Sequence, residues 1–205
     1  MELKEALAEL RKDEKRKFEQ SVDLIVNLKG VDLKRTSVSS VISVPHKIKE
    51  KKVCGFLSKK SPLINSITKP EFDKYKDKKA LKNLIKNYDF FISIAGLMPS
   101  VATTFGKILG PAGKMPSPQL GVISNDDDKS INDILNKISK SVKIRANEPS
   151  IKLSVGRENM KDEEIADNIR AIYNGVINML PAKKDNVRSV LVKFSMSKPI
   201  KLEIK

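Results

Sequence analysis

The residues best suited to chemistry lie in a glycine-rich segment, 106–118, which reads GKILGPAGKMPSP. Glycine lets the backbone approach a phosphate closely and lysine supplies positive charge, so this composition suggests a phosphate-binding loop. Such a loop follows the pattern G-x-x-x-x-G-K-[ST]. Counted from either Gly-Lys pair, the pattern fails twice: at Ile108 and Met115 for one pair, and at Val101 and Ile108 for the other. A stiff, shaped turn is therefore the favoured interpretation, and a phosphate-ligand enzyme with its site at 106–118 is kept as the alternative.

Few other side chains have a type and spacing suited to catalysis or metal binding. The only cysteine is Cys54, in the apolar run VCGFL, and the only histidine is His46. One cysteine forms neither an internal disulfide nor a zinc site, and this histidine has no evident third partner for a catalytic thiol. The acidic segment NDDD (125–128) precedes a helical pattern, where carboxylates more often cap the helix than hold a metal. We therefore expect no catalytic residue, no metal and no cofactor.

Two further stretches combine side chains that suit nucleic acid. The first, KRKFEQSVD (15–23), places cations beside Phe18 at the start of a strand pattern. The second, VRSVLVKFSMSKP (187–199), places cations, serines and Met196 along another strand. Cations bind phosphates, hydroxyls bind phosphate or ribose oxygens, and an aromatic ring or methionine packs on a sugar or base. In the alternative, Phe18 and Met196 are core residues and the lysines only solvate the surface; the residues alone leave both open.

The charge of the chain favours a polyanionic partner. Its 205 residues include 40 Lys and Arg against 25 Asp and Glu, for a net charge of +15. The excess is spread over the whole chain, which favours nucleic acid or an acidic membrane surface. No apolar stretch approaches the ~20 residues needed to cross a membrane, and acidic residues near the N-terminus argue against a signal peptide. With aromatic residues at 5% of the chain, we expect recognition of folded RNA by shape rather than stacking of many unpaired bases.

Hydrophobic periodicity predicts the elements that position these stretches. The two ends of the chain share one style, with half-buried strands and one-sided helices. Strands are predicted there at 21–28, 38–44, 51–57, 150–156, 186–196 and 198–205, and helices near 3–10 and 161–180. The middle differs: helices are predicted at 77–88, 99–109 and 125–140, and strands at 89–96 and 141–145.

This pattern predicts an α/β protein with two domains. The first is a discontinuous α+β domain with a half-buried sheet, formed by residues 1–60 and 150–205. The second, residues 61–149, is an inserted three-layer, Rossmann-like α/β domain with a partly parallel sheet. Because the chain crosses twice between them, near 60–63 and 147–151, we expect a hinge there.

Several segments, in order along most of the chain, carry a family resemblance. They are KFEQSVDLIVNLKGVDLK, VPH, YDFFISIAGLMP followed by GKILGPAGKMPSP, MKDEEIADNIRAIYNGVINML and VRSVLVKFSMSKP. Together they resemble the signatures of the universal large-subunit ribosomal protein L1 family, in its archaeal or eukaryotic-cytosolic form. Two positions depart from the family pattern. Its Thr-Met-Gly is Ser195-Met196-Ser197 here, and the glycine that usually follows Pro-His is Lys47.

The resemblance implies a two-domain protein whose split domain binds a helical site in 23S-type ribosomal RNA. Family members form the mobile stalk beside the tRNA exit site, assist release of deacylated tRNA and repress their own messenger RNA. The implied partners are large-subunit rRNA, exit-site tRNA and its own mRNA, with no membrane, for a cytoplasmic protein that is a monomer when free. Carried over motif by motif, the rRNA-binding residues are Lys17, Phe18, Ser21, Asp23, Ser189, Ser195, Met196 and Ser197. A purely regulatory mRNA repressor acting off the ribosome stays open beside this function.

Overall fold

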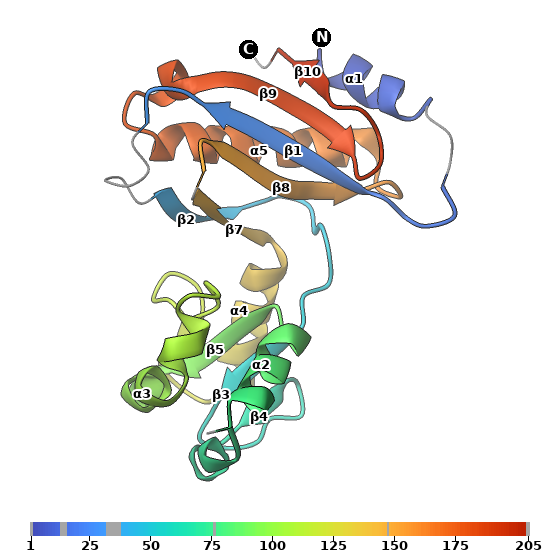
Figure 1. Cartoon of the computed structure of the whole chain (residues 1–205). Coiled ribbons are helices and arrows are strands. Elements are labelled where there is room, and N and C mark those ends of the chain that lie inside the picture. Colours follow the sequence, from blue (N-terminus) through green and yellow to red (C-terminus); the bar gives the residue numbers. More distant parts are fainter. Residues whose placement is uncertain (1, 13–15, 32–37, 76, 147, 204–205) are drawn as a thin grey trace. The chain divides into compact units, whose positions relative to one another are not determined.

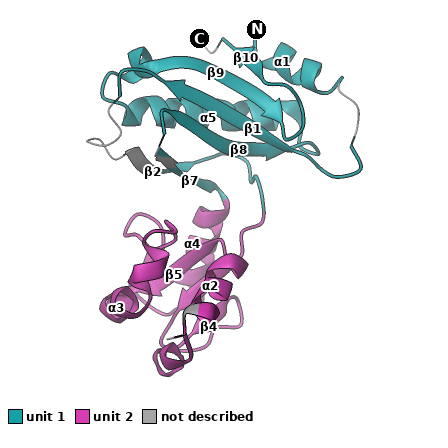
Figure 2. Ribbon diagram, viewed as in Figure 1, with its two compact units in different colours: residues 1–49, 140–205 teal, residues 50–139 magenta. Residues whose placement is uncertain are grey.

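A computed structural model describes residues 2–12, 16–31, 38–75, 77–146 and 148–203 of the chain (Figure 1). The chain divides into two compact units: residues 1–49 with 140–205 form unit 1, and residues 50–139 form unit 2 (Figure 2). Helices are combined with parallel and antiparallel sheets, which confirms the predicted α/β class. In the described ranges, no helix is both long and apolar enough to cross a membrane.

Unit 1 is built on an antiparallel sheet with the strand order β10-β9-β1-β8. β2 and β7 pair with each other in a separate antiparallel sheet. The elements of unit 1 are α1 (Leu3–Leu10), β1 (Ser21–Leu28), β2 (Val38–Ser43), β7 (Ser141–Ala146), β8 (Ser150–Arg157), α5 (Asp162–Met179), the 3-10 helix η3 (Lys183–Asn186), β9 (Val187–Phe194) and β10 (Ile200–Leu202).

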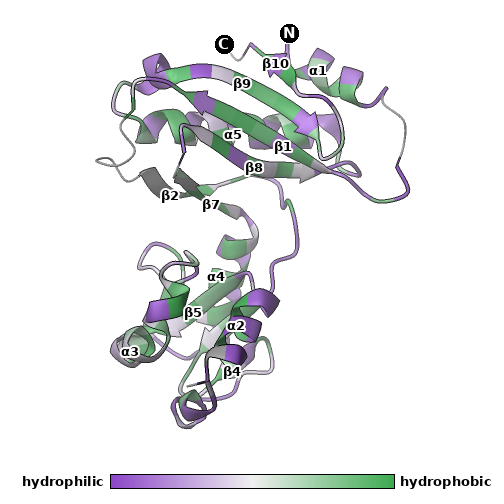
Figure 3. Cartoon of the chain, viewed as in Figure 1, coloured by the Kyte–Doolittle hydropathy of each residue, from purple (hydrophilic) through white to green (hydrophobic). Residues whose placement is uncertain are grey.

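Side-chain alternation in β1 gives this sheet one buried and one half-exposed face. The buried face carries Val22, Leu24, Val26 and Leu28, and the other carries Ser21, Asp23, Ile25 and Asn27. α1 and α5 cover the buried face with apolar stripes that belong to the same core (Figures 1 and 3). Close packing also needs Gly175 of α5, because a Cβ there would lie 2.4 Å from Cδ1 of Ile42 in β2.

A buried amide fixes the VPH segment to unit 1. The side chain of Asn168 in α5 is fully buried; its Oδ1 accepts from the backbone N–H of His46 at 3.0 Å. Its Nδ2 donates to the carbonyl oxygens of His46, at 3.1 Å, and Val155, at 3.0 Å. The chain is thus anchored up to His46 before it enters unit 2 at residue 50. Lys47, which replaces a family glycine, does not have a positive φ, so no glycine is required there.

Unit 2 contains a parallel sheet with the strand order β4-β3-β5-β6. Its elements are β3 (Val53–Phe56), β4 (Asn65–Ile67), the 3-10 helix η1 (Lys69–Tyr75), α2 (Lys78–Asn87), β5 (Phe90–Ile94), the 3-10 helix η2 (Ala95–Leu97), α3 (Met98–Leu109), β6 (Val122–Ile123) and α4 (Asp128–Ser139). One core joins β3 and β5 to η1, α2 and α3, with Phe56 and Phe105 at its centre, 4.8 Å apart between ring centroids. α4 packs through Ile131 and Ile138, which lie outside that core cluster, so helices cover both faces of the sheet.

The unit boundaries differ from the predicted domain boundaries. The chain crosses between units at 49/50 and 139/140, whereas crossings near 60–63 and 147–151 were expected; residue 147 lies outside the described residues. The difference arises at two short strands. β3 pairs in parallel with β4 and β5, which places it in unit 2, while β7 pairs with β2, which places it in unit 1.

Candidate nucleic-acid interface

The two candidate stretches meet at one end of the unit 1 sheet, where β1 begins and β9 ends. The strands are antiparallel and Val22 pairs with Phe194, so the segments before β1 and after β9 are neighbours. The backbone N–H of Ser195 donates to the carbonyl of Ser21 at 3.1 Å, and the two hydroxyls lie 2.8 Å apart. Stretches more than 170 residues apart in sequence therefore form one surface. We call it the strand-end surface: Lys17, Phe18, Ser21, Asp23, Ser195, Met196 and Ser197.

Two large apolar side chains are exposed on this surface. Phe18 is 54% exposed and Met196 is 64% exposed. Among the described residues, the only other exposed large hydrophobic side chain is Leu63 in unit 2, at 43%. The structure therefore places Phe18 and Met196 at the surface rather than in the core, which removes one alternative left open by the sequence. Exposed apolar groups of this size gathered at one place mark interaction sites more often than isolated ones do.

Buried hydrogen bonds hold the backbone that presents Met196. Gln20, only 4% exposed, accepts a hydrogen bond from the backbone N–H of Met196 through Oε1 at 3.2 Å. Gln20 is in turn bonded to Glu158, whose N–H donates to the Gln20 carbonyl at 2.9 Å and whose side chain accepts from the Gln20 N–H. Sequence analysis missed this supporting residue. Position 20 continues the inward-facing alternation of 22, 24 and 26, and that register was the available signal.

The serine at the family's glycine position closes the turn after β9. The hydroxyl of Ser197 accepts from the backbone N–H of Phe194 at 2.8 Å, and the N–H of Ser197 donates to the carbonyl of Phe194 at 3.1 Å. Ser197 has no positive φ, so its side chain causes no backbone strain. On β1, the hydroxyl of Ser21 donates to Oδ1 of Asp23 at 3.1 Å. The hydroxyls and carboxylate are therefore already oriented by one another.

The remaining predicted residues are placed less closely. Lys17 is exposed, and the neighbouring Lys15 lies outside the described residues. Ser189 pairs with Asn27 and accepts from its side chain at 3.0 Å. It shares the half-exposed face but lies six residues from Ser195, about 20 Å along the strand. Ser189 is therefore separate from the strand-end surface.

The glycine-rich segment has a structural role in unit 2. Gly113, with φ of 67°, ends α3: its N–H donates to Gly110 O at 2.9 Å, and the N–H of Lys114 donates to Leu109 O at 3.0 Å. These two bonds form a Schellman motif. The ammonium group of Lys114 donates to the carbonyls of Ile85 and Tyr88, both at 2.7 Å. The lysine thus caps the C-terminus of α2.

The carboxyl ends of the parallel strands are closed by the protein itself. In such sheets, ligands usually bind where the strand order reverses, here between β3 and β5. Oδ2 of Asp126 accepts from the backbone N–H groups of Ser58 and Lys59, both at 3.0 Å, directly after β3. The NDDD segment, expected to cap its own helix, therefore uses Asp126 on the neighbouring loop instead. In the described part of the chain, no group of side chains is suited to holding a metal.

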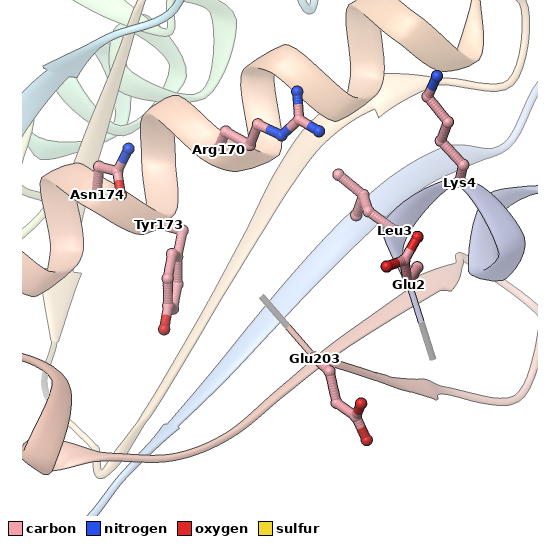
Figure 4. A pocket seen from close by; sticks show the side chains of 7 residues that line it. All are labelled: Glu2, Leu3, Lys4, Arg170, Tyr173, Asn174 and Glu203. Carbon is pink, nitrogen blue, oxygen red and sulfur yellow. The ribbon is translucent and has the colours of Figure 1, made fainter. Parts of the chain in front are cut away.

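The other candidate sites offer no convergent chemistry. A hollow of about 450 Å³ in unit 1 is lined from α1, α5 and the segment after β10 (Figure 4). It mixes Glu2 and Glu203 with Lys4 and Arg170, and it shares no residue with the strand-end surface. Burial raises the pKa of the Cys54 thiol to about 12, so this thiol is a core group rather than a nucleophile.

Comparison with known proteins agrees with this arrangement. Residues 10–198 match the family described as Ribosomal protein L1p/L10e family, and the chain belongs to that family. A protein from Pyrobaculum calidifontis named large ribosomal subunit protein uL1 is 35% identical, with 95% of this chain and 89% of the relative covered. A protein of the same name from Thermococcus kodakarensis is 34% identical, with 92% and 90% covered. The chain is therefore a ribosomal-family protein and not an enzyme, which decides against a catalytic site at 106–118.

Proposed function

We propose that this chain is a cytoplasmic constituent of the large ribosomal subunit and binds large-subunit rRNA through the strand-end surface. The observation that carries the proposal is the pair of exposed side chains, Phe18 and Met196, beside hydroxyls already fixed by hydrogen bonds. Family membership supports RNA as the ligand, since the relatives are large-subunit proteins by name.

The chemistry of the surface fits helical RNA. The minor groove of A-form RNA is wide and shallow and displays 2′-hydroxyl groups. The serines donate to and accept from those hydroxyls, and the carboxylate of Asp23 accepts from a 2′-hydroxyl. Phe18 and Met196 pack on sugars or an unstacked base, while Lys17 contacts phosphate. Ser189 contributes at a second point along the same sheet face.

We further propose the finer functions that the family resemblance implies. The chain forms the mobile stalk beside the tRNA exit site, and the two chain crossings act as a hinge that assists release of deacylated tRNA. The strand-end surface also binds the chain's own messenger RNA. Because one surface serves both RNAs, rRNA and mRNA exclude each other, and this competition produces translational repression when free protein accumulates.

Co-sedimentation tests this function against an mRNA repressor that acts only off the ribosome. The full chain is mixed with large subunits depleted of their own copy, at moderate salt, and centrifuged. We expect one copy per subunit in the pellet, and a fragment of the chain's own mRNA should displace it. Recovery in the supernatant, with the mRNA fragment still bound, would favour the off-ribosome repressor.

A further inference from the structure

The exposed face of α2 in unit 2 carries a stripe of positive charge. Lys79, Lys82 and Lys86 recur at i, i+3 and i+7, so they share one helix face, and all three are exposed. The opposite face buries Leu81 and Leu84 in the aromatic core. We call the three residues the α2 lysine stripe. It spans about 10 Å along the helix axis at 1.5 Å per residue.

This stripe is unfavourable for the isolated helix. α2 contains no carboxylate, and Lys79 lies in its first turn, where the helix dipole disfavours a cation. Lys82 and Lys86 are like charges four residues apart, which also destabilises a helix. Within the described ranges, none of the three lysines forms an ion pair. Folding of the unit therefore gives no reason for the stripe.

Other helices of the protein distribute their charges differently. In α4, Asp133 stands four residues from both Lys129 and Lys137, a spacing that lets opposite charges attract. α5 begins with three acidic residues at the end of the helix where carboxylates are favoured. α2 alone of these three has a uniformly positive exposed face.

The surroundings of α2 add little negative charge at its C-terminal end. The Lys114 ammonium group binds two carbonyls there, which neutralises the negative end of the helix dipole. At the other end, the N-cap Asp77 accepts from the backbone N–H of Lys79. Nearby in η1, Glu71 is paired with Lys60 at 3.0 Å. The stripe therefore keeps its positive field.

We propose that the α2 lysine stripe is a second RNA-binding site, which takes the phosphate backbone of double-helical RNA without reading sequence. Phosphates on one strand of a nucleic-acid duplex advance roughly 3.4 Å along its axis, so a stripe of this length covers several of them. The choice of RNA over another polyanion rests on the proposed function. The site itself lies wholly within unit 2 and uses none of the residues of the strand-end surface.

The test compares two matched double variants of the full chain. K82Q/K86Q removes two stripe lysines, and K129Q/K137Q removes two exposed lysines from α4 of the same unit, with the same change in net charge. The probe is a 20-base-pair RNA duplex of arbitrary sequence, titrated over a salt series, with M196D added to both to disable the strand-end surface. We expect K82Q/K86Q to weaken binding about fivefold or more and to flatten the log–log salt slope by roughly 1.5, at about 0.9 per phosphate contact. K129Q/K137Q should change the slope by less than half as much.

Three outcomes would overturn the proposal. Equal losses in both double variants would show general charge attraction. Equal competition by polyglutamate and by unlabelled duplex RNA, or the same difference between variants on phosphatidylserine vesicles, would show a site for other polyanions. The thermal midpoint of K82Q/K86Q should stay level or rise, which separates lost contacts from unfolding. Failure of the proposed rRNA function is measured separately, with an rRNA fragment and the single variant M196D, so the two failures are distinguishable.

Discussion

The two sheets of this protein end in opposite ways. Where β1 begins and β9 ends in unit 1, Phe18 and Met196 are exposed and the nearby hydroxyls are held by hydrogen bonds. At the carboxyl ends of the parallel strands in unit 2, Asp126 already occupies the backbone N–H groups that an anionic ligand would use. The fold most often associated with ligand crevices is closed here, and the plainer antiparallel sheet offers the open surface. Fold class alone therefore would have pointed to the wrong unit.

The largest effect on this contrast is expected from Asp126→Ala. Its carboxylate is the only acceptor seen for the N–H groups of Ser58 and Lys59 in the described structure. Bonds to a charged acceptor are worth about 1.5–3 kcal/mol each when buried, so we expect unit 2 to lose roughly 2 kcal/mol at this half-buried site. Hydrogen exchange at the amides of β3 and β5 measures the loss.

Asp127→Ala is the matched control, because the neighbouring carboxylate is exposed. It should change protection by less than about 0.5 kcal/mol. Affinity for an rRNA fragment should stay the same in both variants. A loss of rRNA affinity in Asp126→Ala alone would contradict the assignment of RNA binding to unit 1.

A smaller effect is expected from Ser195→Ala at the open end of unit 1. The change removes the hydroxyl that accepts from the Ser21 N–H at 3.2 Å and contacts the Ser21 hydroxyl. A neutral hydrogen bond contributes about 1 kcal/mol, so rRNA affinity in a filter-binding titration should fall about fivefold. Ser195→Thr keeps the hydroxyl and should restore binding. Equal affinity in the alanine variant would remove this hydroxyl pair from the interface.

The smallest effect is a pH dependence confined to unit 2. Burial lowers the pKa of the Lys51 ammonium group from 10.5 to about 8, with the charge of Asp89 opposing the shift. Between these values the unfolded chain binds more protons than the folded one, so stability due to Lys51 rises with pH. The free energy of unfolding of the wild type, relative to Lys51→Met, should therefore increase from pH 8 to pH 10.5. Urea titrations measure it, and a flat difference would show that Lys51 is not buried as described; Lys52→Met is the adjacent control.

Periodicity was sufficient to predict most of the fold. The alternation of β1 and the stripes of α2 and α5 are strong signals because one face of each element is buried. Boundaries between the units were harder, since β3 and β7 are short strands whose pairing partners are far away in sequence. Nothing local to VCGF or SVKIRA shows which sheet each joins.

The site was predictable in part. Motif resemblance located Phe18 and Met196, but only the structure shows that both are exposed and that Ser21 and Ser195 meet. Gln20 and Asp126 were missed as supporting residues because their roles depend on backbone groups 176 and about 68 residues away. The separation of Ser189 from the other residues also required the strand register.

The most direct test of the central claim compares Met196→Asp with Leu63→Asp. Both variants place a carboxylate at an exposed apolar position, one on the strand-end surface and one in unit 2. Affinity for a large-subunit rRNA fragment is measured by filter binding at fixed salt, with circular dichroism as the check on folding. Met196→Asp should weaken binding at least about 30-fold, since a central contact is worth about 2 kcal/mol or more, while Leu63→Asp should leave binding within about twofold. Undiminished affinity in a folded Met196→Asp protein would contradict the account.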